Sequence, residues 1–189
     1  MAVDPELRRR LLGIARAAIA RAIGAAHQGE RAAAPASGEP RVRPGDSGVF
    51  VSLHRRSDGD LRGCIGCFEG KGSLEETVAR MAVEAATHDP RFAPVSPDEL
   101  DGLSLEISVL SPMEDVAEPN QVEVGVHGLV ASRGGRRGVL LPQVATENGW
   151  DREEFLGQTC RKAGLDRDAW AKPGTRIQVF TADVFGEDS

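Results

Sequence analysis

Residues 49–68 of this 189-residue chain read VFVSLHRRSDGDLRGCIGCF, and this stretch organises the expected fold. Val49, Val51 and Leu53 recur at every second position, which is the period of a half-buried β-strand. Ser57-Asp58-Gly59 then supplies residues typical of a turn, so that Leu61–Phe68 can return antiparallel to the first arm. The stretch therefore predicts a β-hairpin that carries the hexapeptide LRGCIG on its second arm.

Cys64 lies between Gly63 and Gly66 of this hexapeptide, and its other neighbour, Ile65, points to the opposite face of a strand. On an extended strand Arg62 and Cys64 share a face, about 6–7 Å apart at Cα. A guanidinium that near can favour the thiolate if the two side chains converge. Ile65 then points into the core, while Gly63 and Gly66 permit close approach of another backbone or a ligand. Two interpretations stay open: a nucleophilic or ligand-contacting Cys64, and a small buried cysteine in a tightly packed hairpin.

Cys64 and Cys67 also have the CxxC spacing of redox dithiols and of half a zinc site. On a strand the two residues point to opposite faces, roughly 10 Å apart, which exceeds the ~7 Å Cα limit for a disulfide. Only a tight turn at Gly66 would let the pair close. Cys160 and the four histidines show no metal-ligand spacing. We therefore expect no metal site, and whether Cys67 pairs with Cys64 stays open.

Glu106 and His127, which lie further along the chain, are candidates to assist the thiol. His127 is bracketed by small residues in a predicted strand, and it could act as a base for Cys64. Glu106 alternates with apolar residues in another predicted strand. It is either a general base or ligand contact, or the ion-pair partner of Arg62 or Arg91. One sequence alone places neither residue beside the sulfur.

Local signals predict the remaining elements. Asp4-Pro5 opens a helix that Gly24 ends, and Ser73–Glu76 is a capping box that opens a second helix. Asp151 caps a third helix, with Gly164 in the left-handed position at its C-terminal end. Further strands are predicted over Leu103–Val109, Val122–Ser132, Gly138–Leu141 and Ile177–Phe185, the middle two forming a hairpin around Gly134-Gly135. Because hairpins outnumber strand–helix–strand crossovers, we expect an α+β fold, a mainly antiparallel β-sheet flanked by helices.

Composition narrows the classes of function. A chain of this length fits one domain over residues 1–189, with a core over about 5–185 and a flexible loop at the Ala- and Pro-rich stretch 30–46. The net charge of −6 argues against a nucleic-acid partner. No apolar stretch is long and uncharged enough to span a membrane, and three cysteines favour a reducing, cytoplasmic location. Cofactor, substrate and oligomeric state stay undetermined.

Several motifs in order resemble the AMMECR domain family, known in bacteria and archaea as protein A of the AmmeMemoRadiSam system. The hexapeptide Leu61–Gly66 is similar to the signature of that family. The resemblance extends over about residues 5–185 and includes six further segments. These are Gly48-Val49-Phe50-Val51, Asp89-Pro90-Arg91-Phe92, Leu105–Leu110, His127-Gly128-Leu129-Val130, Leu140–Val144 and Lys162-Ala163-Gly164-Leu165.

The resemblance implies an α+β fold of two unequal lobes, with the signature near a groove. It also implies a Memo-like protein and a radical-SAM protein as partners in one modification pathway. Arg62, Gly63, Cys64, Ile65 and Gly66 carry over as signature positions, none of them as an assigned catalytic residue. Cys67 departs from the family pattern, so a shared mechanism would not rely on it. Two hypotheses follow: a ligand- or partner-binding groove at the signature, and a cysteine-dependent enzyme that uses Cys64.

Overall fold

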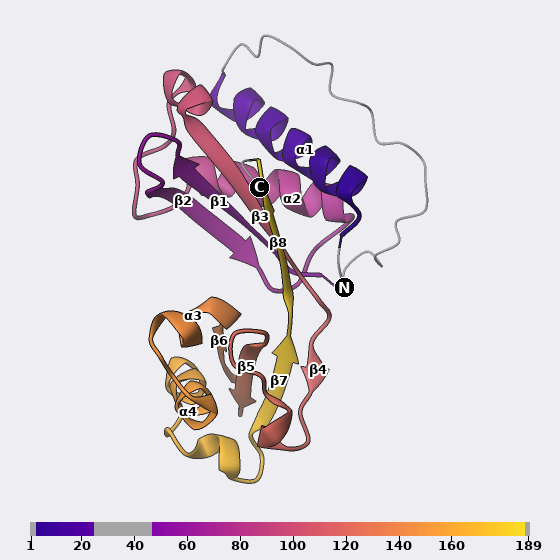
Figure 1. The fold of residues 1–189 in the computed structure, drawn as a ribbon, viewed down its shortest axis with the longest axis vertical. Coiled ribbons are helices and arrows are strands. Elements are labelled where there is room, and N and C mark those ends of the chain that lie inside the picture. The colour runs from indigo at the N-terminus through magenta and orange to yellow at the C-terminus, as the bar shows by residue number, and fades with distance from the viewer. Residues whose placement is uncertain (1–2, 25–46, 188–189) are drawn as a thin grey trace. The chain divides into compact units, whose positions relative to one another are not determined.

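The computed structural model describes residues 3–24 and 47–187, and these fold as two compact units. The first unit comprises Met1–Leu110 and Asp183–Ser189, and the second comprises Ser111–Ala182. Each unit contains an antiparallel four-stranded sheet and helices (Figure 1). The expected α+β class with two unequal lobes is confirmed. The loop predicted over residues 30–46 lies outside the described residues, and the prediction of a single domain stays a prediction.

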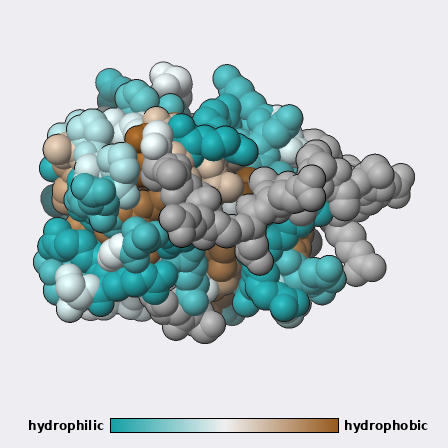
Figure 2. Space-filling model, turned by 90° about the horizontal axis from the view of Figure 1, so that it is seen from above, coloured by the Kyte–Doolittle hydropathy of each residue, from teal (hydrophilic) through white to brown (hydrophobic). Residues whose placement is uncertain are grey.

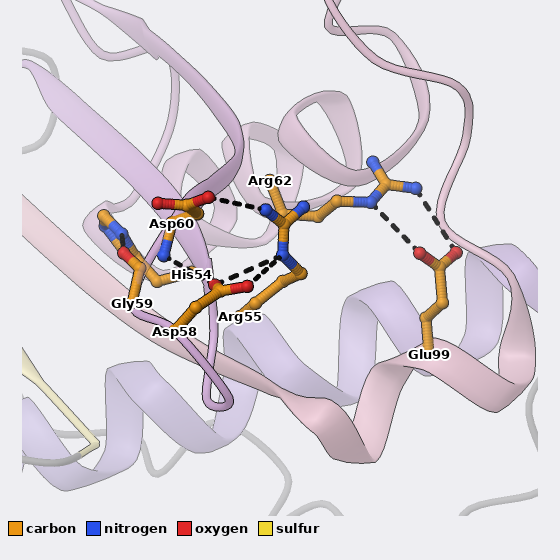
Figure 3. A network of polar contacts seen from close by, with 7 residues as sticks. All are labelled: His54, Arg55, Asp58, Gly59, Asp60, Arg62 and Glu99. Atoms are coloured by element: carbon orange, nitrogen blue, oxygen red, sulfur yellow. Dashed lines mark hydrogen bonds and ion pairs between the residues drawn. The ribbon is translucent and has the colours of Figure 1, made fainter.

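The sheet of the first unit has the strand order β2-β1-β3-β8. Its strands are β1 (Val49–Arg55), β2 (Leu61–Cys67), β3 (Leu103–Leu110) and β8 (Ala182–Gly186). The predicted hairpin is confirmed, because β1 and β2 pair antiparallel with Val51 opposite Ile65. At the turn Gly59 has a φ of +77°, and the guanidinium of Arg55 contacts the carboxylates of Asp58 and Asp60 (Figure 3). The edge strand β2 therefore has a fixed register.

Two helices cover one face of this sheet, α1 (Pro5–Ile23) and α2 (Leu74–Thr87) (Figure 1). Asp4 and Gly24 cap α1, and the reciprocal capping box of Ser73 and Glu76 opens α2, as predicted. The helices bury the alternate residues of β1 and β3 that begin with Val49 and Leu103. The intervening side chains point to the other side, which we call the outer face. It carries Phe50, Ser52, His54, Cys64, Ser104, Glu106 and Ser108.

The second unit has the strand order β4-β7-β5-β6. Its strands are β4 (Glu114–Asp115), β5 (Gly128–Arg133), β6 (Arg136–Leu140) and β7 (Arg176–Phe180), and its helices are α3 (Pro142–Glu147) and α4 (Arg152–Lys162). As predicted, Asp151 caps α4 and Gly164 has a left-handed φ of +71°. Phe155 of α4 is the largest fully buried side chain of a separate apolar core, which also contains Leu129 and Leu156. Short 3₁₀ helices occupy Pro97–Gly102 in the first unit, and Pro119–Gln121 and Ala169–Ala171 in the second.

Two strand predictions were wrong in extent. The strand predicted from Val122 begins only at Gly128, because the N–H groups of Val126 and His127 donate to the carbonyl of Glu123 and form a turn. The strand predicted over Ile177–Phe185 is two strands in different sheets. The buried residues Phe180 and Phe185 are five positions apart, so they cannot share a face of one strand.

Among the helices of the described residues, none is both long enough and apolar enough to cross a membrane. Hydrophilic residues cover most of the coloured surface in Figure 2, and hydrophobic residues show mainly in the recesses between them. Of the large apolar side chains, Val126 and Val184 are the ones that stand out as exposed in the described part of the chain.

Candidate functional site around Cys64

The glycines of the signature serve close packing. A Cβ placed on Gly63 would meet the carbonyl oxygen of Ala85 well inside the 3.0 Å that real Cβ atoms keep, because α2 passes directly against β2 there. A Cβ on Gly66 would collide in the same way with the ring of Phe50. Ile65 packs against the core of the first unit. These three signature residues therefore let the strand fit between its neighbours.

Arg62 is held by an ion pair with Glu99. The β1–β2 register shifts at Leu53 and His54, so Arg62 has no partner in the ladder. Its guanidinium donates to both carboxylate oxygens of Glu99, at 3.1 and 3.3 Å (Figure 3). It also donates to the carbonyl of Ala93 at 2.9 Å. The backbone N–H of Ser96 and then the Arg62 guanidinium hold the pKa of Glu99 below its usual value. The charge of Arg62 is thus used to anchor the segment before β3.

The backbone of Cys64 is clamped by two side chains of the Asp89-Pro90-Arg91 segment. Because β2 is an edge strand, one side of its backbone has no strand partner. The Cys64 N–H donates to Asp89 at 2.8 Å, and the Cys64 carbonyl accepts from Arg91 at 3.2 Å. Asp89 is buried, and the Arg91 guanidinium beside it holds the pKa of that carboxyl well below its usual range. This clamp fixes the position of Cys64 and closes the sheet edge to another strand.

The side chain of Cys64 lies half-buried on the outer face. The Ser52 hydroxyl donates to its sulfur at 3.2 Å. Glu106 lies opposite Ser52 on β3, with its Cβ about 5 Å from that of Ser52. Cys64, Ser52 and Glu106 therefore form a row across three strands: a thiol, a hydroxyl and a carboxylate. Such a row can hold a polar ligand by hydrogen bonds, or move a proton away from the thiol.

The other predicted candidates are placed differently. Cys67 packs against the helix-covered core, on the opposite face of β2 from Cys64, and all three cysteines are free thiols. Glu106 is not the ion partner of Arg62 or Arg91, since these pair with Glu99 and Asp89. Within the described residues, no group of three or more His, Cys, Asp and Glu side chains could hold a metal ion.

His127 belongs to the second unit and directly precedes β5, where the predicted strand was to have included it. Its ring Nδ1 accepts the backbone N–H of Glu123 at 3.1 Å, so this imidazole closes a turn. When neutral, the ring carries its proton on Nε2. Its role as a base for Cys64 stays a prediction.

Sequence reasoning missed three residues of this site, Ser52, Asp89 and Arg91. Ser52 could have been found by pairing the two arms of the hairpin around the Ser57–Gly59 turn, which brings it opposite Cys64. No comparable local signal predicts the contacts of Asp89 and Arg91, although their segment is one of those that resemble the family. Their contacts cross 25 and 27 residues of sequence and depend on how α2 ends.

The fold and the site together define a class of α+β proteins, in which two antiparallel sheets form separate units and a clamped edge strand presents one cysteine. A solved structure with a similar fold is the crystal structure of PH0010 from Pyrococcus horikoshii, which has a TM-score of 0.78 and 38% sequence identity, over 98% of this chain and 94% of that one. The AMMECR1 family model matches residues 12–185, so this chain belongs to the AMMECR1 family.

Archaeal relatives support the same assignment. A protein from Methanothermobacter thermautotrophicus is 50% identical over 147 residues, which cover 75% of this chain and 76% of the relative. Protein MK0488 from Methanopyrus kandleri is 45% identical over 148 residues, which cover 75% and 72% of the two chains. The expected family is confirmed.

Proposed function

We propose that this chain is a binding component of a modification pathway that it shares with a Memo-like protein and a radical-SAM protein. Its ligand, or a segment of its partner, occupies the outer face of the first sheet around Cys64. The partners are implied by the family resemblance. The contacts of the signature residues support this location for the site.

The observation that carries the proposal is that each signature residue makes a different kind of contact. Gly63 and Gly66 make room for α2 and Phe50, Ile65 fills the core, and Arg62 pairs with Glu99. Of residues 62–66, Cys64 alone turns its side chain to the outer face, and its backbone is the part that the Asp89–Arg91 clamp holds. A strand fixed by so many contacts presents its one remaining side chain with little freedom. Such preorganisation suits recognition of a ligand, because less motion is lost on binding.

The chemistry of the outer face restricts the class of ligand that can bind there. Around the thiol lie the hydroxyl of Ser52, the carboxylate of Glu106 and the apolar ring of Phe50. Both nearby guanidiniums are held by Asp89 and Glu99, which weakens their attraction for an anion. We therefore expect a neutral or cationic group with hydrogen-bond donors toward Glu106.

A co-purification experiment tests the binding proposal. The chain is co-expressed with its Memo-like and radical-SAM partners, and capture is compared between wild type, Ser52→Arg and Gly13→Arg. Ser52→Arg places a long charged side chain at the centre of the outer face. The matched control adds the same side chain to α1, where no atom lies within 4 Å of an added Cβ. Loss of capture with Ser52→Arg alone supports the proposal, and equal capture by both variants refutes it.

A second function, a cysteine-dependent enzyme, is favoured by the short contact between Ser52 and Cys64. In this scheme the Cys64 sulfur adds to a carbonyl carbon of the substrate, and the π electrons of that carbonyl move onto its oxygen. The thiol proton passes to the Ser52 hydroxyl oxygen, which releases its own proton to Glu106. The scheme requires a thiol that reacts faster than its neighbours. Cys67 is a matched control, since it is half-buried on the same strand and faces the core.

Alkylation rates and product formation separate the two functions. With iodoacetamide at neutral pH, the enzyme scheme requires Cys64 to be labelled well before Cys67 and Cys160. Burial raises the pKa of the Cys160 thiol, so that residue sets the slow limit. Equal rates at Cys64 and Cys67 in the native protein argue against an activated nucleophile. Cys64→Ser should retain partner capture under the binding proposal. If it retains capture and abolishes the pathway product, the enzyme scheme replaces the binding proposal.

A further inference from the structure

We propose that the tip of the β5–β6 hairpin is a binding site for a phosphorylated small molecule, held by Arg133 and Arg136. This site lies in the second unit, and its argument is independent of the proposed function at Cys64. Nothing about its residues follows from the signature. The charges at this tip are arranged in a way that is unfavourable for the fold alone.

Arg133 and Arg136 are the last cross-strand pair of the hairpin. Gly134 and Gly135 have φ values of +56° and +80°, which is the two-residue turn that sets strand register. The two arginines therefore leave the sheet on one face, with Cβ atoms about 5 Å apart. Like charges directly opposite each other destabilise a sheet. Conflicts of this kind between local rules and the fold are expected at functional sites.

The two arginines line a depression of about 350 Å³, together with residues 164–166 and Ala169. Arg136 is oriented by a 2.8 Å hydrogen bond from its guanidinium to the carbonyl of Gly164. The Arg133 guanidinium has no hydrogen bond or ion pair with any residue that the structure describes. One fixed and one unoccupied guanidinium thus converge on the same hollow.

Other cations lie around this hollow. Asp166, the one acidic residue among the described lining, has Lys172 Nζ 3.8 Å from its carboxylate. Asp168 raises the pKa of Lys172, and the charge of Arg133 opposes that rise. Arg133 and Lys172 therefore repel each other. A neighbouring depression of about 420 Å³ shares Arg133 and Arg136 and adds Arg137 and Arg176, of which Arg176 is paired with Asp115. In a chain of net charge −6, Arg133 and Arg136 form a local excess of positive charge, because neither has an ion pair with a residue that the structure describes.

The chemistry of the lining selects the ligand class. Planar guanidiniums bind phosphate oxygens in a bidentate manner, and two of them can hold one phosphoryl group from both sides. The volume suits a small molecule. Neither depression has an aromatic residue in its described lining on which a base could stack, which argues against a nucleic-acid strand. A phosphate or diphosphate group is therefore the chemistry that fits.

The first test uses inorganic phosphate and pyrophosphate as probes with the full chain. Backbone amide shifts are followed by ¹⁵N NMR in wild type, Arg133→Gln, Arg136→Gln and the control Arg161→Gln. Arg161 is exposed on α4 and lines neither depression. Pyrophosphate should shift the amides of residues 133–136, with affinity at least tenfold weaker in the two tip variants and unchanged in the control. Equal affinity in all four proteins overturns the proposal, as do equal shifts with chloride at matched ionic strength.

A second measurement separates binding from folding. Without ligand, Arg133→Gln should raise the thermal midpoint, because it removes the like-charge pair. Pyrophosphate should raise the midpoint of wild type and of Arg161→Gln, and leave that of Arg133→Gln unchanged. A lower midpoint for ligand-free Arg133→Gln would mean that the pair stabilises the hairpin, which overturns the argument from charge conflict. A pyrophosphate response retained by that variant overturns the site.

Discussion

Asp89→Asn is the substitution that tests the clamp on the edge strand most directly. The buried carboxylate of Asp89 accepts the backbone N–H of Cys64 at 2.8 Å and that of Arg91 at 3.0 Å. It also accepts the Arg91 guanidinium at 3.0 and 2.7 Å. Asparagine has the same shape, but it has one acceptor oxygen and an NH₂ group that would face an N–H donor. The substitution therefore removes charge and leaves a donor without a partner.

The expected loss can be estimated from these contacts. A buried N–H left without an acceptor costs about 1–3 kcal/mol, and a hydrogen bond to a charged group contributes about 1.5–3 kcal/mol. The Arg91 side chain is 54% exposed, so solvent screening reduces the share of its ion pair. We expect the free energy of unfolding to fall by about 2–4 kcal/mol at pH 7. That is a large part of the roughly 5–15 kcal/mol that stabilises a typical domain.

The loss should depend on pH in a definite direction. The Arg91 guanidinium and the N–H groups hold the pKa of Asp89 well below that of the unfolded chain, although burial opposes them. Stability from a carboxyl with a lowered pKa is fully present above its unfolded pKa of about 4, and is lost as pH falls toward the folded pKa. The difference between wild type and Asp89→Asn should therefore be constant from pH 7 to about 5, and shrink below pH 4.

Urea unfolding measures this difference, with circular dichroism and tryptophan fluorescence recorded together. Trp150 and Trp170 both belong to the second unit, so fluorescence reports on that unit while circular dichroism reports on both. Asp58→Asn is the control, because Asp58 accepts N–H groups in an exposed turn. We expect little change from it. If Asp89→Asn changes the midpoint no more than Asp58→Asn, or by the same amount at pH 7 and pH 3, the clamp does not have the proposed energetic role.

Three further substitutions test the packing of β2 against α2, the core of the second unit and the ion pair of Arg62. Gly63→Ala should lower the free energy of unfolding by about 1–3 kcal/mol or more, because its Cβ meets a backbone carbonyl of α2. The control Gly13→Ala, at an open position of α1, should not destabilise the protein. Phe155→Ala should cost about 3–5 kcal/mol and be seen first by fluorescence, since this ring fills the second core. Arg62→Lys should cost about 1–2 kcal/mol in urea unfolding, because lysine cannot pair with Glu99 through two nitrogens; an unchanged midpoint would contradict the anchoring role.

The sequence was sufficient wherever the signal was local. The cap at Asp4, the capping box at Ser73, the hairpin turn at Gly59 and the left-handed Gly164 were all predicted, and all are confirmed. In each case the interacting atoms are a few residues apart, so the residue types alone specify the conformation. The family assignment also came from the sequence, because its motifs occur in order along the chain.

The tertiary structure decided what the signature residues contact. Arg62 and Cys64 were expected to share their chemistry, yet Arg62 pairs with Glu99, 37 residues away, and the Cys64 backbone is held by Asp89, 25 residues away. The division of residues 176–186 between two sheets was likewise decided by tertiary packing, in which Phe180 and Phe185 are both buried. Alternation along a strand says which residues share a face. It does not say which distant residues meet that face, because such contacts form only when the helices and both sheets have packed.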